Sequence, residues 1–161
     1  MERPETPTAG MQLDSRLKNG ANWFFWIAGL SLVNSVLLLS GASWSFVVGL
    51  GVTQYVDLIA SFLRKNPGHG TLVGAALGLN AFVAGLFALF GVYARRGRAW
   101  AFVAGITLYA LDGVVLGLFG EWWSVGFHGL MLWWLAGGLR ASRALARLEL
   151  ETRDSAGQAV K

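Results

Sequence analysis

The residues of this chain that could carry chemistry are a few polar side chains inside otherwise apolar stretches. Asp112 and His128 are ionisable, and Asn34 and Asn80 carry amides. An ionisable group placed in lipid is costly, so each is a functional candidate by default. A carboxylate beside a histidine could pass protons, bind a polar head group or hold a cation.

These four side chains are expected at one level of a helical bundle. At 1.5 Å per residue, each lies roughly 9–14 Å below the outer boundary expected for its apolar stretch. Gln54 and Asp57, on a more polar segment, are expected just beyond this layer. The layer could be a ligand pocket. Alternatively, its members satisfy one another's hydrogen bonds and specify packing register rather than a reaction.

No catalytic motif accompanies the polar residues. The chain has no G-x-S-x-G elbow, no H-E-x-x-H and no P-loop, so we assign no catalytic residue. It has no Cys, which excludes disulfides and thiolate metal sites. A metal site is a weaker hypothesis without tight ligand spacing, and its candidates would be His69, Glu121, Asp57, Asp112 and His128. The sequence indicates no particular cofactor.

The composition is that of an integral membrane protein. The 161 residues suit one domain. They are 55% hydrophobic and only 14% charged, against roughly 25% charged in soluble domains. Membrane helices are rich in Gly and their interfaces in Trp, and the chain has 22 Gly and 8 Trp. The net charge of +4 lies beside apolar runs, without a basic stripe interleaved with stacking aromatics, which argues against nucleic-acid binding.

Four apolar runs are long enough to cross a bilayer, at residues 21–40, 71–93, 99–119 and 122–139. A fifth run, 46–63, carries its polar residues on one helical face: Thr53, Gln54, Asp57, Ser61 and Arg64. This pattern predicts an amphipathic helix at the membrane interface or in a groove of the bundle. The predicted fold is an all-α, four-helix transmembrane bundle plus one interfacial helix on its outer face.

Charge distribution predicts the topology. With four crossings, all but two of the 13 Lys and Arg fall on one side. The positive-inside rule makes that side the cytoplasm, so we expect both termini there. Residues 1–20 would be a polar tail, and 141–161 a basic helix extension with a disordered end. Compact loops and the charge bias make a bacterial inner membrane the default location.

Two kinds of surface contact are expected. Arg140, Arg143 and Arg147 share one helical face, which suits anionic lipid or a cytoplasmic partner. Two small-xxx-small pairs allow close helix approach, within the bundle or in a dimer, and they are Gly74 with Gly78 and Gly113 with Gly117. The sequence does not determine the oligomeric state.

Small size, short loops and aromatic helix faces favour a non-enzymatic accessory or assembly subunit of a larger membrane complex. Trp133 and Trp134 lie deep in the last run and are candidate contacts for a partner or a pigment. One alternative is an autonomous binder or carrier of a small ligand or lipid that uses the polar layer. A second alternative is a small membrane enzyme.

Overall fold

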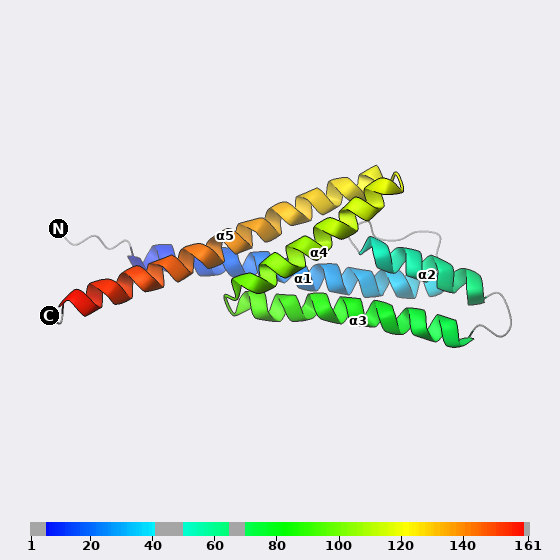
Figure 1. The fold of residues 1–161 in the computed structure, drawn as a ribbon, viewed down its shortest axis with the longest axis horizontal. Coiled ribbons are helices and arrows are strands. Elements are labelled where there is room, and N and C mark those ends of the chain that lie inside the picture. The colour runs from blue at the N-terminus through cyan, green and yellow to red at the C-terminus, as the bar shows by residue number, and fades with distance from the viewer. Residues whose placement is uncertain (1–5, 41–49, 65–69, 160–161) are drawn as a thin grey trace.

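The computed structural model describes residues 6–40, 50–64 and 70–159, in which all regular secondary structure is α-helical, which confirms the all-α prediction. Figure 1 shows α1, α3, α4 and α5 running lengthwise in alternating directions, so α1 begins at the same end as α5 finishes. Tight reversals follow α3 and α4, where Gly97 and Gly120 have φ of 77° and 79°. The helices are α1 (Thr6–Leu39), α2 (Gly51–Arg64), α3 (Gly70–Arg95), α4 (Ala99–Leu118) and α5 (Trp122–Ala159).

Three helices of the described chain are long and apolar enough to cross a membrane, one fewer than predicted. They are α1 over Ala9–Leu37, α3 and α4. The predicted span at 122–139 falls within α5, where Trp, Gly, Ser and His128 interrupt the aliphatic residues. Trp and Gly are common in membrane helices but add little to mean hydropathy. The segment therefore has the length of a membrane span without the hydropathy of the other three.

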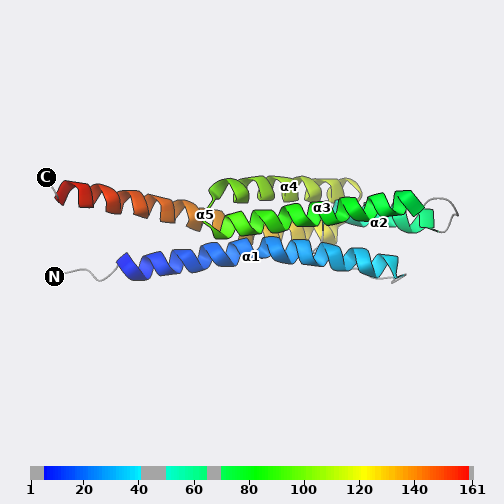
Figure 2. The same cartoon turned by 90° about the horizontal axis from the view of Figure 1, so that it is seen from below.

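Both end helices are longer than predicted. α1 begins at Thr6 instead of near residue 21, and α5 continues as helix to Ala159 where a disordered end was expected. Leu17 is buried in the core and Leu145 packs against it, so contact between the two helices extends beyond the apolar runs. In Figure 2, α1 runs along one side of the molecule, with α3 beside it.

α2 presents its polar face to the bundle and its apolar face outward. Thr53 and Asp57 are buried, whereas Leu58, Ile59 and Phe62 are exposed. α2 packs on α1, α3 and α4, beside one end of the bundle in Figure 1. Of the two placements expected for the amphipathic 46–63 segment, the groove of the bundle is the one observed. Residues 46–49 lie outside the described chain.

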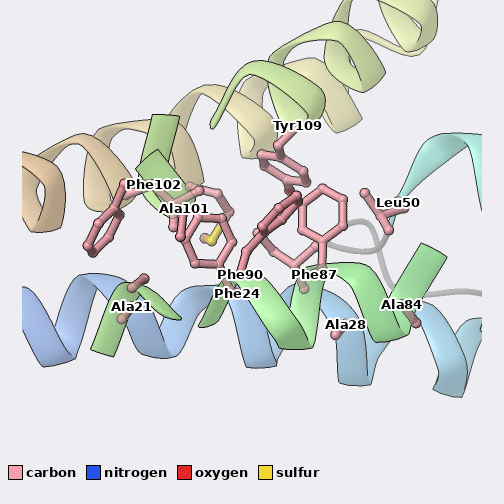
Figure 3. Close-up of a cluster of buried hydrophobic side chains, with 14 of the residues drawn as sticks. Ala21, Phe24, Ala28, Leu50, Ala84, Phe87, Phe90, Ala101, Phe102 and Tyr109 are labelled. Carbon is pink, nitrogen blue, oxygen red and sulfur yellow. The ribbon is translucent and has the colours of Figure 1, made fainter. Parts of the chain in front are cut away.

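Aromatic rings fill the core between the helices, as Figure 3 shows. Phe24 of α1 contacts Phe87 and Phe90 of α3 and Phe102 of α4, with ring centroids 5.8–6.3 Å apart. Such tilted ring pairs contribute beyond the area that they bury. Tyr109 extends this group toward α5.

Glycines set the closest helix contacts, in part where predicted. Gly113 packs on His128, at 3.2 Å from the position a Cβ would take, which confirms the intramolecular contact. Gly74 and Gly78 face open space, so their predicted packing within the bundle is wrong. The tightest contact against backbone among the described glycines joins α1 to α5 through Gly20 and Gly138, where an added Cβ would overlap main-chain atoms.

Gly138→Leu should therefore destabilise the bundle, whereas Gly137→Leu should not. A Cβ at Gly138 would lie 2.7 Å from Phe102 and 2.9 Å from Gly20, while one at Gly137 would meet nothing within 4 Å. We expect Gly138→Leu to lower the free energy of unfolding by about 3 kcal/mol. Thermal unfolding of both variants in mild detergent measures this, and equal melting curves would contradict it.

Candidate functional site

The Asp112 carboxylate binds the first turn of α2. Its Oδ2 accepts the Gly51 N–H at 2.7 Å and its Oδ1 accepts the Val52 N–H at 2.8 Å. Asp112 is buried on α4, so this helix N-terminus is capped from another helix. The neighbouring Leu50 N–H is satisfied similarly, by Ser31 Oγ of α1 at 2.8 Å. A negative charge here also interacts favourably with the α2 dipole.

His128 of α5 completes the hydrogen bonding of Asp112. Its Nδ1 lies 2.8 Å from the Ser124 carbonyl oxygen, which can only accept, so Nδ1 donates. Its Nε2 lies 2.9 Å from Asp112 Oδ2. A hydrogen bond between Nε2 and Oδ2 therefore joins α5 to α4, while Asp112 also holds the first turn of α2. The Tyr109 ring stacks on the His128 ring, with 4.2 Å between centroids.

A second polar group lies on the next turn of α2. Asn80 of α3 donates its amide to Asp57 Oδ1 and to Ser35 Oγ of α1. Asp57 Oδ2 and Asn80 Oδ1 are buried acceptors without a partner in the described chain. One proton on Oδ2 would let the acid and the amide form a cyclic pair with two hydrogen bonds. Burial raises the pKa of Asp57, outweighing the opposing hydrogen bonds of Ser35 and Asn80, so the protonated form is favoured.

The structure buries the predicted polar residues but divides them into two groups joined by α2. One group pairs Asp112 with His128, and the other pairs Asn80 with Asp57. Asn34 is buried on α1, and Gln54 is half-buried on α2. In both groups most donors and acceptors are used within the protein, so the arrangement is suited to fixing α2 on the bundle.

The supporting serines and threonine were not predicted. Ser31, Ser35, Thr53 and Ser124 all hydrogen-bond within these groups. One available signal was Leu50 at the N-cap position of α2, because the Leu side chain cannot accept a hydrogen bond there as Ser, Thr, Asp or Asn would. The first turn of α2 therefore needs acceptors from elsewhere in the protein. A second signal was the four-residue spacing of Ser31 and Ser35, which places them on one helical face.

The other predicted sites lie on surfaces. No group of three or more metal-ligating residues occurs in the described ranges, and His69 falls outside them. Trp133 and Trp134 are exposed on α5, where Trp134 stacks on Trp23 and the Arg140 guanidinium covers Trp133. The other two predicted lipid contacts, Arg143 and Arg147, are also exposed on α5.

An apolar pocket of about 290 Å³ lies beside Asp112, between α2, α3 and α4. Apart from Asp112, its lining is aliphatic and aromatic, including Leu50, Val83 and Leu111. Since both Asp112 oxygens already accept hydrogen bonds, the pocket offers a ligand little polar recognition.

Comparison of the chain with protein families, curated proteins and solved structures finds no match.

Asp112→Asn should destabilise the protein. The amide would place its NH2 group against an N–H group, so at least one buried donor would lose its acceptor, at an expected cost of about 3 kcal/mol. Thermal unfolding in detergent measures the loss. The control is Glu121→Gln, which neutralises an exposed acid between α4 and α5. If the two variants melted alike, Asp112 would not be stabilising α2.

Asp57→Asn, unlike Asp112→Asn, should preserve or raise the stability of the protein. Its NH2 group can supply the donor that Asn80 Oδ1 lacks. Since the pKa of Asp57 is raised in the folded protein, the wild type is more stable at low pH. It should lose stability as pH rises from the ordinary carboxyl range through the raised pKa. We expect Asp57→Asn to abolish this part of the pH dependence and to be at least as stable as the wild type at pH 8.

Melting curves across pH test this expectation, with Asp57→Leu as the control. Leu is similar in size but cannot pair with Asn80, so it should be less stable than Asp57→Asn at every pH. A pH dependence of stability in Asp57→Asn equal to that of the wild type would show that Asp57 is already ionised in the folded protein.

Proposed function

We propose that this chain is a small, non-enzymatic, multi-pass membrane protein that serves as an accessory subunit of a larger membrane complex. In this proposal α5 is a fourth crossing, and both termini lie in the cytoplasm of a bacterial inner membrane. The Arg-containing turn at residues 95–98 lies at the same end of the bundle as the start of α1, in keeping with the positive-inside rule.

The observation that carries the proposal is the bare face of α3. Only 17% of its apolar stretch is buried, against 44% in α1 and 39% in α4. Gly74, Gly78 and Gly85 follow one another at helical spacing on this face, and a Cβ on any of them would meet nothing within 4 Å. Exposed Leu77 and Phe82 flank the glycines. A shallow channel of this kind accepts the backbone of another membrane helix.

The interior polar groups support a binding role over a catalytic one. Asp112 and His128 hold each other and α2 by hydrogen bonds, so a reaction would have to break the contacts that position them. The alternative of a small-ligand carrier is weakened for the same reason. The partner we propose is therefore a transmembrane helix of a different subunit, packed along α3.

Gly74→Leu/Gly78→Leu should abolish partner binding without unfolding the protein. The new side chains enter open space, and Leu is a better helix former than Gly, so we expect the melting temperature to fall by less than about 3 °C. Gentle native purification, followed by mass spectrometry, should recover a stoichiometric membrane protein with the wild type and lose it with the variant.

The matched control is Gly126→Leu/Gly129→Leu, because these α5 glycines also face open space. This variant should keep the partner. Retention of the partner by the α3 variant would refute α3 docking. Efficient crosslinking of Gly78→Cys to a second copy would instead identify the occupant as this same chain and overturn the accessory-subunit proposal.

A further inference from the structure

A groove between α1 and α5 lies apart from both polar groups and from the bare face of α3. Its volume is about 450 Å³. Its lining includes Gly20, Gly137 and Gly138, so part of its floor is helix backbone. Since a Cβ on Gly137 would meet nothing within 4 Å, the space above this residue is open.

The groove is lined by both cationic and aromatic side chains. Arg16 and Arg140 line it together with Trp133 and Trp134. Trp23 of α1 stacks on Trp134 of the antiparallel α5, with ring centroids 6.1 Å apart. Arg16 precedes Trp23 and Arg140 follows Trp134, so the backbones of both arginines lie toward the same end of the bundle. The Arg140 guanidinium folds back over the Trp133 ring, 5.7 Å from its centroid, so cationic and aromatic groups adjoin in the groove.

The two guanidinium groups are available to bind an anion. Neither is in an ion pair within the described ranges. The acid near Arg16 in sequence, Asp14, is paired with Lys18 at 2.7 Å. Arg140 covers the Trp133 ring and directs its Nε–H at the Ala136 carbonyl at 3.3 Å, so both terminal NH2 groups still lack a hydrogen-bond acceptor within the described ranges.

We propose that this groove binds one anionic phospholipid, with its phosphate between Arg16 and Arg140 and an acyl chain along Trp133 and Trp134. Guanidinium groups bind phosphate oxygens through paired hydrogen bonds, and indole rings pack well against lipid near the head groups. Free phosphate would contact only the arginines, whereas a phospholipid also matches the indole rings beside them. This site requires only that the groove faces lipid, so it is independent of docking on α3.

The test uses the full-length protein in mild non-ionic detergent, titrated with dioleoylphosphatidylglycerol and observed by native mass spectrometry. We expect one tightly bound lipid per chain. Removal of both contacts in Arg16→Gln/Arg140→Gln should weaken binding about 30-fold. The control Arg143→Gln/Arg147→Gln removes the same charge from exposed positions outside the lining of the groove and should weaken binding less than about threefold.

A variant that fills the groove separates shape from charge. Gly137→Leu places a side chain in the open space and should prevent binding while leaving the melting curve unchanged. Equal weakening by the two arginine pairs would overturn the proposal in favour of a nonspecific basic surface. Equal binding of dioleoylphosphatidylcholine would overturn the phosphate contact. Displacement of the lipid by millimolar inorganic phosphate would show that the site recognises the free anion.

Discussion

The contact between the Asp112 carboxylate and the first turn of α2 is the interaction on which the arrangement of the bundle depends. A helix that begins against other helices exposes backbone N–H groups that water cannot satisfy. Asp112 accepts two of these groups and Ser31 accepts a third. With this end satisfied, α2 can direct its polar residues inward and its apolar residues outward. Its position in turn buries Asp57 beside Asn80.

The two buried aspartates illustrate how hydrogen bonds determine the state of a carboxyl group. Asp112 receives backbone donors on both oxygens and lies within hydrogen-bond distance of the His128 ring. Asp57 receives a donor from Asn80 on one oxygen only, and its other oxygen has no partner in the described residues. The same residue type therefore has two roles: both oxygens of Asp112 hold another helix, whereas Asp57 keeps one oxygen unpaired among the described residues and has a pKa that burial raises. A substitution by Asn distinguishes the two roles because it preserves shape and changes only the donors.

Much of this architecture could be predicted from the sequence, because lipid imposes simple rules on composition and length. Apolar runs located the helices, and the rarity of polar residues within them identified Asn34, Asn80, Asp112 and His128 as interior groups. Asp57 was expected just beyond this layer but is buried as well. The pairing of Asp112 with α2 could not be predicted, since it joins residues about 60 positions apart and leaves no local pattern. Glycine spacing was also ambiguous. The spacing predicted packing within the bundle for both Gly113 and Gly74, but only Gly113 contacts another helix. Small residues suit contacts within a chain and between chains equally, so spacing alone does not distinguish the two.

The long sequence separation of the α2 cap has a consequence for biogenesis. α2 is the second helix to leave the ribosome, yet Asp112 follows it by 61 residues from Gly51, and His128 is later still. Until α4 and α5 have been made, the first N–H groups of α2 lack these acceptors, and burying them unpaired would be costly. The first turn of α2 is therefore completed by parts of the chain that are made after it.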